Sequence, residues 1–180
     1  MEHERKGMIH DYTGDGKGKT TAALGLAFRM VGSGAHVVMF QFLKNTESGE
    51  LPASGAFGGK FEIIRAQHDF KEWVHELTDE QRDIVFEANR KLFEGALNAV
   101  INSKCDMVIL DEIMFAMKTR IVSVEQVMDL ISKKPAHMEI VLTGRDAPEE
   151  LNGVADYVSF IRMVKHPYTR RRSARKGIEY

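Results

Sequence analysis

The sequence predicts an α/β fold in which a mostly parallel sheet is covered by helices on both faces. Three observations support this prediction: short apolar segments alternate with helical patterns, two of the helices begin with capping boxes, and a glycine-rich turn joins the first apolar segment to the first helix. The chain has 180 residues, and one domain takes roughly 100–200 residues. We therefore expect a single domain that spans residues 1–180.

Several apolar segments have the length and composition of buried strands. Strands of a parallel sheet are buried on both faces, so they form near-continuous apolar runs. The expected strands are Met8–Thr13, His36–Leu43, Phe61–Arg65, Met107–Leu110, Glu139–Thr143 and Tyr157–Ile161. Between the second and third of these, Lys44–Lys60 is rich in glycine, serine and alanine. We expect a long surface loop there, and loops of that length are commonly functional or disordered.

The first helix is expected over Thr20–Gly32, directly after the glycine-rich turn. Its expected buried face follows the i, i+3, i+4, i+7 spacing and consists of Leu24, Ala27, Phe28 and Val31. The glycines at 32 and 34 end the helix, because glycine is the usual residue just past a helix C-terminus.

Two later helices begin with capping boxes, in which a Thr or Ser side chain caps the helix and a Gln three residues on reaches back. Thr78 and Gln81 predict the start of a long helix that ends near Ser103. Ser123 and Gln126 predict a second helix that stops before Pro135. A short helix is expected over Pro148–Ala155.

Composition excludes several classes of protein. The 25 basic and 26 acidic side chains leave a net charge of -1, which argues against a nucleic-acid partner. The longest apolar stretches, such as Ala22–Phe28, fall far short of the roughly 20 residues of a membrane span. The charged start Met1–Lys6 has no apolar segment behind it and does not resemble a signal peptide. With a lone cysteine, Cys105, these features predict a soluble protein of the reducing cytoplasm.

The strongest motif is Thr13–Thr21, which reads Thr-Gly-Asp-Gly-Lys-Gly-Lys-Thr-Thr between the first strand and the first helix. This is the context of a P-loop, whose backbone amides and helix N-terminus bind phosphate while its lysine supplies a full positive charge. Thr13 stands where the usual pattern has glycine, so the loop is a variant. The residues expected to contact the nucleotide are Gly14, Asp15, Gly16, Lys17, Gly18, Lys19, Thr20 and Thr21.

Further candidates follow later strands. Asp111 and Glu112 end an apolar strand in the manner of a Walker-B motif, so with Thr20 they are the expected Mg²⁺ ligands; which of the two acids contacts the metal stays open. Arg145, also at a strand end, either reaches phosphate or is an exposed turn arginine. These residues predict a nucleoside triphosphate site with magnesium. They leave open phosphoryl transfer, hydrolysis and attack on the ribose 5′ carbon.

The chain resembles the P-loop corrinoid adenosyltransferases, which act on cob(I)alamin or cob(I)yrinic acid a,c-diamide. The family shares the threonine at the position of Thr13. The stretches that carry the resemblance are Tyr12–Ala27, Gln41–Lys44, Val108–Ile113, Val141–Arg145 with Ala147–Leu151, and Val164–Tyr168 with Gly177–Tyr180.

The resemblance implies a P-loop NTPase-like fold and a reaction. In this family the 5′-deoxyadenosyl group of ATP moves to the cobalt of a reduced corrinoid, and triphosphate is released. By position, Lys19 and Thr20 are the catalytic residues, and Arg29 on the first helix is either a nucleotide contact or an exposed arginine. The family is often homodimeric, and its chemistry allows a flavoprotein reductase as a partner.

Phe70 and Trp73 are the residues that the resemblance assigns to the corrinoid, and here the sequence departs from the family. Many members have Phe-x-Trp at this place, whereas this chain has Phe70-Lys-Glu-Trp73. The alternative is that the two rings anchor the loop on the core. A second departure is the run Arg170–Arg172, which either steers anionic substrates or is a solvated charge run.

Two other function classes stay open beside adenosyl transfer. One is a P-loop ATPase or a small-molecule kinase, which uses the same phosphate site. The other is a carrier that binds a nucleotide or a corrinoid without turnover. The products distinguish them: triphosphate indicates adenosyl transfer, ADP or orthophosphate indicates the ATPase or kinase, and unchanged ATP indicates the carrier.

Overall fold

The computed structural model describes residues 6–167 and 173–180 and contains a single sheet of six parallel strands in the order β3-β2-β4-β5-β1-β6. The strands are β1 (Ile9–Thr13), β2 (Val37–Gln41), β3 (Phe61–Arg65), β4 (Met107–Asp111), β5 (Glu139–Thr143) and β6 (Tyr157–Phe160). Each lies where the sequence predicts a strand. All the pairings are parallel, with β1 between β5 and β6, so the carboxyl ends of all strands meet at one edge.

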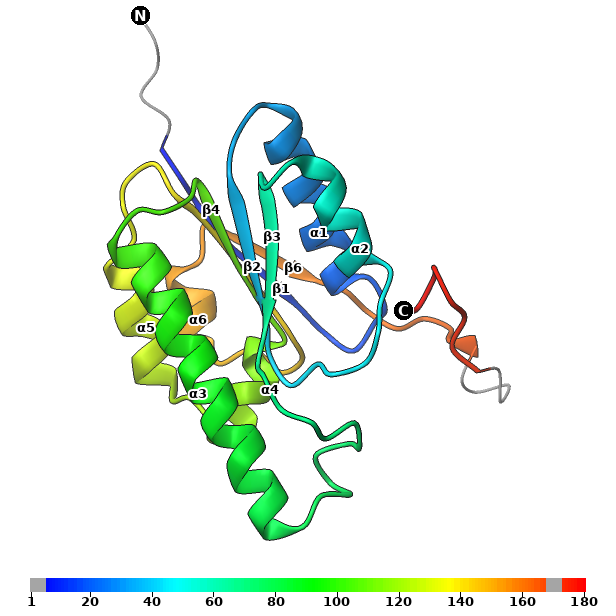
Figure 1. The fold of residues 1–180 in the computed structure, drawn as a ribbon. Helices are drawn as coiled ribbons and strands as arrows, with labels where there is room; N and C mark the ends of the chain where they lie inside the picture. The colour runs from blue at the N-terminus through cyan, green and yellow to red at the C-terminus, as the bar shows by residue number, and fades with distance from the viewer. Residues whose placement is uncertain (1–5, 168–172) are drawn as a thin grey trace, which may run out of the picture.

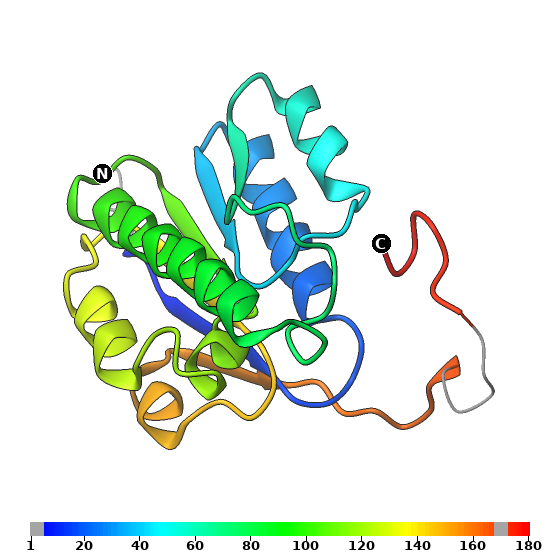
Figure 2. The same cartoon turned by 60° about the horizontal axis from the view of Figure 1, so that its bottom comes forward.

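Helices cover both faces of the sheet, as Figures 1 and 2 show. On one face lie α1 (Lys19–Gly32), α2 (Glu50–Ser54) and the 3₁₀ turn η1 (Gly55–Phe57). On the other lie α3 (Asp79–Ile101), α4 (Ile113–Lys118), α5 (Val124–Ser132) and α6 (Glu149–Val154). Because α1 leaves β1 toward one face and α4 and α6 leave β4 and β5 toward the other, a crevice opens at the carboxyl ends of these strands.

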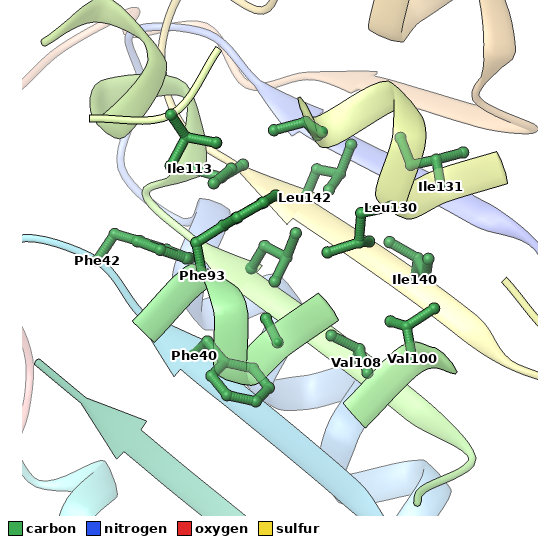
Figure 3. Packing of buried hydrophobic residues seen from close by; sticks show 14 of the residues in the cluster. Phe40, Phe42, Phe93, Val100, Val108, Ile113, Leu130, Ile131, Ile140 and Leu142 are labelled. Carbon is green, nitrogen blue, oxygen red and sulfur yellow. The ribbon is translucent and has the colours of Figure 1, made fainter. Parts of the chain in front are cut away.

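The core is divided between the two faces. Under α3, α5 and α6 lies the larger cluster, in which Phe93 of α3 and Leu130 of α5 pack over Val108 and Leu142 of the sheet (Figure 3). Under α1 lies a smaller cluster built on Ala23, Ala27, Met39 and Ile109. Both predicted capping boxes are present, at Thr78 for α3 and at Ser123 for α5. None of the helices in the described part of the chain is long and apolar enough to cross a bilayer.

Three sequence predictions about the fold are corrected. Lys44–Lys60 is not a plain loop, because it contains α2 and η1. Helix α4 was not predicted. The predicted inner face of α1 is wrong at Phe28, whose side chain is 64% exposed and instead packs edge-on against Phe57, with ring centroids 6.0 Å apart.

Candidate active site

A cavity of about 900 Å³ lies at the carboxyl ends of the strands, in the crevice that the topology opens. Its first wall is the P-loop with the start of α1. Its other walls come from the segment after β2, the ends of β4 and β5, and the segment after β6. Besides residues 15–21, the polar side chains that line it include Lys44, Glu50, Glu112, Arg145, Glu179 and Tyr180.

The glycines of the P-loop allow it to pack against the backbone that follows β6. A Cβ atom at Gly14 or Gly16 would lie only 2.5 or 2.7 Å from the carbonyl oxygen of Ile161. That carbonyl accepts a 2.7 Å hydrogen bond from the Gly16 amide. The Gly16 amide is therefore engaged with the protein in this structure, and the predicted contact of Gly16 with the nucleotide stays a prediction.

Two side chains of the P-loop region also hold neighbouring backbone. At the variant position, the buried Thr13 hydroxyl accepts a 3.2 Å hydrogen bond from the Ala147 amide, which ties the loop to the segment after β5. The Asp15 carboxylate accepts a 2.9 Å hydrogen bond from the Met163 amide, which lowers the pKa of Asp15. Asp15 lines the cavity, but this carboxylate oxygen is engaged with the protein.

Lys19 is buried and points back into its own loop. Its Nζ donates to the carbonyl oxygens of Gly14 and Gly16, at 2.7 and 2.8 Å. Burial lowers the pKa of Lys19, while the nearby Glu112 acts in the opposite direction. The ammonium group is thus already positioned at the N-terminus of α1, held by two oxygens that a phosphate group can replace.

Asp111 at the end of β4 is fully buried, and its carboxylate accepts hydrogen bonds from three other elements, namely α1, β2 and β5. Its Oδ1 accepts hydrogen bonds from the hydroxyls of Thr20 (2.8 Å) and Thr143 (2.7 Å), and its Oδ2 accepts one from Gln41 Nε2 (3.1 Å). The hydroxyl of Thr20 and the carboxylate of Asp111, which are 91 residues apart in the sequence, therefore lie in direct contact.

Glu112 forms the rim of the cavity beside Asp111. It has a φ of 61°, a left-handed conformation that is uncommon for a residue with a Cβ, and its amide donates to Thr143 Oγ1 at 2.9 Å. Burial and then the charge of Asp111 raise the pKa of Glu112. A cation bound next to it would reverse both effects.

The chemistry of these oxygen donors fits a magnesium ion. Mg²⁺ prefers carboxylate and hydroxyl oxygens and commonly completes its shell with substrate phosphates and water. In the described part of the chain no group of three or more acidic, His or Cys side chains forms a metal cluster. Thr20 with Asp111 or Glu112 would thus supply only part of a coordination shell, as expected for an ion that arrives with a triphosphate.

The wall opposite the P-loop was missed as a site by sequence reasoning, which noted Gln41–Lys44 only as a stretch of resemblance. Lys44 Nζ donates to Glu50 Oε1 at 2.8 Å and lies 3.9 Å from Asp111 Oδ2. Burial alone would raise the pKa of Glu50, but the hydrogen bonds from Lys44 and Gln41 outweigh burial and lower it to about 2. Glu50 is therefore an anion across the whole physiological pH range.

The two predicted arginines differ in position. Arg145 is exposed on the rim of the cavity, after Gly144, whose φ is 150° and whose Cα approaches Met114 too closely to carry a side chain. Arg29 is exposed on α1 and does not line this cavity. The structure brings Arg145 to the P-loop and does not bring Arg29 there.

Phe70 and Trp73 lie in the loop between β3 and α3, outside the 900 Å³ cavity. Phe70 is half-buried and stacks on His68, with ring centroids 6.3 Å apart. Trp73 is 68% exposed, so the alternative that it anchors the loop on the core is wrong for Trp73. Asn45 Nδ2 donates to the carbonyl of Phe70 at 2.7 Å, which ties this loop to the segment that carries Lys44.

The chain's last residues also line the cavity, although sequence reasoning noted Gly177–Tyr180 only as a stretch of resemblance. Gly177–Tyr180 form part of its wall on the side of the P-loop, where the red segment approaches α1 in Figures 1 and 2. Arg175 pairs with Glu179 at 2.9 Å, and this pairing lowers the pKa of Glu179 to about 2. The run Arg170–Arg172 lies outside the described residues.

In chemical terms, the cavity offers ammonium groups on two sides, a guanidinium group on the rim and hard oxygen donors at its base. The cations are Lys17, Lys19, Lys44 and Arg145, and the oxygen donors that line the cavity are Thr20 and Glu112, with the buried Asp111 in contact with Thr20. That set suits a triphosphate with a divalent cation. It does not by itself specify which bond of the nucleotide is cleaved.

The fold is shared with a solved structure of very different sequence. The flagellar accessory protein FlaH from Methanocaldococcus jannaschii superposes with a TM-score of 0.60 at 13% identity, covering 87% of this chain and 71% of that one. This likeness confirms the predicted α/β P-loop fold and carries no information on function.

Relatives in sequence are much closer. The family model for "ATP:corrinoid adenosyltransferase BtuR/CobO/CobP" matches residues 5–180. The corrinoid adenosyltransferase CobA of Salmonella typhimurium is 32% identical over 178 residues, which cover 98% of this chain and 87% of that protein. A corrinoid adenosyltransferase from a Sinorhizobium species is 33% identical over 180 residues, covering 98% and 82%. The chain therefore belongs to the ATP:corrinoid adenosyltransferase family.

Proposed function

We propose that this protein transfers the 5′-deoxyadenosyl group of ATP to the Co(I) centre of a reduced corrinoid and releases triphosphate. Family membership over residues 5–180 supports the substrates. The observation in the structure that best supports the proposal is the contact of Thr20 with the buried Asp111. A hydroxyl, a carboxylate and the buried ammonium of Lys19 at the strand ends suit a triphosphate with a divalent cation. Both ATP and the corrinoid are substrates, and neither is a resident cofactor.

In the proposed reaction the electron pair of Co(I) attacks C5′ of the ribose, the Co–C bond forms, and the C5′–O5′ bond breaks with its electrons on oxygen. Since cobalt is the nucleophile, the protein needs only to align the reactants and to stabilise charge on the leaving triphosphate. Lys19 and the loop Gly14–Thr21 would bind the triphosphate, and Arg145 would reach it from the rim.

Magnesium would be held by Thr20 and by Asp111 or Glu112, whose hydroxyl and carboxylate oxygens suit the ion. When bound, it supplies positive charge that offsets the negative charge of the triphosphate. Among the chain's own residues, Thr143 and Gln41 keep Asp111 oriented through their hydrogen bonds of 2.7 and 3.1 Å. The fully buried carboxylate of Asp111 is thus held in a fixed position next to Thr20, which lines the cavity, before the nucleotide binds.

For the corrinoid we propose the side of the molecule that carries Phe70 and Trp73. Trp73 is 68% exposed, and tryptophan is enriched at binding interfaces because its large ring is apolar while its N–H can meet a polar partner. The link from Asn45 to the Phe70 carbonyl supports this assignment, because it places the loop next to the Lys44 wall of the nucleotide cavity.

We also propose a homodimer in the cytoplasm, with a flavoprotein reductase as the electron donor. The exposed edge strand β6 supports self-association, since Tyr157, Val158 and Phe160 are about half exposed or more. Sedimentation of the purified chain tests the dimer: a single species of one chain's mass across micromolar concentrations would contradict it.

An anaerobic assay tests the proposed reaction. Cobalamin is reduced chemically to Co(I), and the protein, ATP and magnesium are added. The expected result is loss of the Co(I) spectrum and growth of a light-sensitive product whose Co–C bond breaks on illumination to give Co(II). Co(I) that persists while ATP is hydrolysed to ADP would instead support the P-loop ATPase or kinase, and unchanged Co(I) and ATP would support a carrier.

A further inference from the structure

In the proposed reaction, negative charge develops at a different position on the nucleotide than it does in an ordinary P-loop hydrolase or kinase. Cleavage of the C5′–O5′ bond leaves a new negative charge on an oxygen of the α-phosphate, at the opposite end of the triphosphate from the γ-phosphate. One lysine of the P-loop cannot contact both ends of that chain. A cation on another wall of the cavity would stabilise the leaving group, because charge developing in a water-poor site is best met by preorganised positive groups. This inference rests on the proposed function, because it assumes adenosyl transfer. Its test measures anion binding alone and does not depend on that reaction.

Lys44 is such a cation. It lies after β2, on a different wall from the P-loop, and its side chain lines the cavity. About a quarter of the side chain is exposed (26%). Its Nζ is 3.9 Å from Asp111 Oδ2, so it stands beside the same carboxylate that contacts Thr20 on the P-loop side.

Other side chains hold the two carboxylates that Lys44 contacts in place. Glu50 accepts a hydrogen bond from its ammonium at 2.8 Å and another from Gln41 at 3.2 Å. Gln41 in turn donates to Asp111 through Nε2 and accepts from Arg65 Nε at 2.8 Å. Hydrogen bonds from Gln41, which Arg65 in turn contacts, therefore connect Glu50 with Asp111, and Lys44 lies next to both carboxylates.

Arg65 illustrates by contrast what a structural cation looks like in this network. Its guanidinium donates hydrogen bonds to Gln41, to the carbonyl of Thr46 at 2.6 Å and to the hydroxyl of Ser48 at 2.6 Å, and it also lies 3.7 Å from Glu50 Oε1. It does not line the cavity. Within the described part of the chain, Lys44 donates a hydrogen bond to Glu50 alone, and its flexible stem can rotate toward a phosphate oxygen.

We propose that Lys44 is a second triphosphate-binding cation, and that Glu50 is the partner that holds it until nucleotide binds. The two lysines then behave alike. Lys19 rests on the carbonyls of Gly14 and Gly16, Lys44 rests on Glu50, and each exchanges a protein oxygen for a phosphate oxygen. While it rests on Glu50, Lys44 Nζ lies 3.9 Å from Asp111 Oδ2.

A purely structural role for Lys44 makes a different prediction. If the Lys44–Glu50 pair served only to fasten α2 to the strand ends, Lys44→Gln would remove no phosphate contact and would bind tripolyphosphate like the parent. If Glu50 is a competitor for the ammonium, removing its charge frees Lys44. The two substitutions then have opposite effects on anion affinity.

The experiment measures binding of inorganic tripolyphosphate to the full chain by calorimetry, without corrinoid and with EDTA present so that no divalent cation contributes. Lys44→Gln is expected to weaken binding at least tenfold, and Glu50→Gln is expected to tighten it about threefold or more. Lys44→Arg, which keeps the charge, is expected to stay within about threefold of the parent. Lys91→Gln, an exposed lysine on α3 outside the cavity, is the matched control and should bind like the parent.

Parent-like binding by Lys44→Gln, or equal weakening by Lys44→Gln and Glu50→Gln, would overturn the proposal. If Lys44→Gln does not fold, as judged by circular dichroism, Glu50→Gln and Lys44→Arg still decide by the direction of their effects. The result is separable from the proposed function. A parent that adenosylates cobalamin while Lys44→Gln binds normally overturns only the role of Lys44, and a parent that binds tripolyphosphate through Lys44 without adenosylating overturns only the reaction.

Discussion

The two sides of the proposed active site are built differently. On the nucleotide side, each polar group is positioned by a strand end or a helix start, and the central carboxylate, Asp111, is fully buried with three hydrogen-bond partners. On the corrinoid side, Trp73 is 68% exposed in a loop, and Phe70 is attached to the rest of the site through one hydrogen bond to its backbone. The first side is ready before the ligand arrives, whereas the second needs its ligand to become buried.

This difference agrees with the sizes of the two ligands. A triphosphate is small and highly charged, so it requires fixed amides and cations at short distances. A corrinoid is a broad ring, and it can be covered by rings such as Phe70 and Trp73 closing over its face. Substitutions on each side test this difference. Those on the nucleotide side should change ATP binding and turnover, whereas those on the corrinoid side should change only the reaction steps that involve the corrinoid.

The largest effect is expected for Lys19→Ala. It removes the buried ammonium at the N-terminus of α1, so turnover should fall by about 100-fold or more and ATP affinity should fall with it. Steady-state adenosylation at several ATP concentrations measures both effects, and circular dichroism checks the fold. A variant as active as the parent at subsaturating ATP would remove Lys19 from the site.

A smaller effect, on the magnesium requirement, is expected for Thr20→Ala. The substitution deletes a hydroxyl that contacts Asp111 at 2.8 Å, so the magnesium concentration for half-maximal activity should rise by roughly 10-fold. The matched control is Thr119→Ala, whose hydroxyl bonds the Phe115 carbonyl outside the cavity. Identical magnesium curves for parent and Thr20→Ala would show that Thr20 is not a metal ligand.

On the exposed side, Phe70→Ala should affect one half of the reaction only. Bulky apolar side chains can exclude the lower axial ligand of cobalamin and so ease reduction of Co(II). We expect at least about a tenfold loss, corresponding to about 1.4 kcal/mol, when the assay starts from Co(II) with a weak reductant. With Co(I) supplied ready-made, activity should be nearly that of the parent.

Equal losses in both assays with a lowered melting temperature would show that Phe70 anchors the loop instead. The same pair of assays on Trp73→Ala tests whether the changed spacing still delivers this ring to the corrinoid. If both variants match the parent from Co(II), the corrinoid binds elsewhere and the comparison between the two sides fails.

The smallest effect on activity is expected for Asp11→Asn, which instead changes stability. Asp11 on β1 is fully buried, neither of its carboxylate oxygens has a hydrogen-bond partner among the described residues, and burial raises its pKa to about 6. Between about pH 4 and pH 6 the folded chain holds a proton that the unfolded chain has lost, so stability falls as pH rises. Above that range the cost of the charge is about 3 kcal/mol at most.

Asp11→Asn removes this charge, so it should stabilise the protein at pH 8 and lose that advantage by pH 4. Urea unfolding at both pH values measures the difference, with the exposed Asp83→Asn on α3 as the control. A constant difference between parent and Asp11→Asn at both pH values would mean that burial does not shift the pKa of Asp11 away from its value in the unfolded chain.

Sequence reasoning succeeded where the signal is local. The P-loop, both capping boxes and the strands depend on residues within a few positions of one another, and the structure contains all of them. The predicted inner face of α1 is wrong only at Phe28, because the helix packs on the sheet through the small residues Ala23 and Ala27 and Phe28 packs against Phe57 instead. Spacing alone does not tell which of two neighbouring stripes is buried.

The missed parts depend on contacts that spacing does not encode. Helix α4 has only six residues, too few to show a helical period, and it follows β4 directly. Lys44 and Glu50 lie in a segment whose composition is that of a loop, and their importance comes from Asp111, which is distant in the sequence. The approach of Tyr180 to the P-loop cavity likewise has no local signal.

The central claim is that the cavity around Lys19 and Asp111 breaks the C5′–O5′ bond of ATP and leaves the three phosphates joined. Phosphorus NMR of the anaerobic reaction with Co(I) tests it most directly, because it identifies every phosphate product. We predict one triphosphate for each ATP consumed and for each Co–C bond formed, with both products lost in Lys19→Ala. ADP with orthophosphate, formed at the same rate with and without the corrinoid, would contradict the claim.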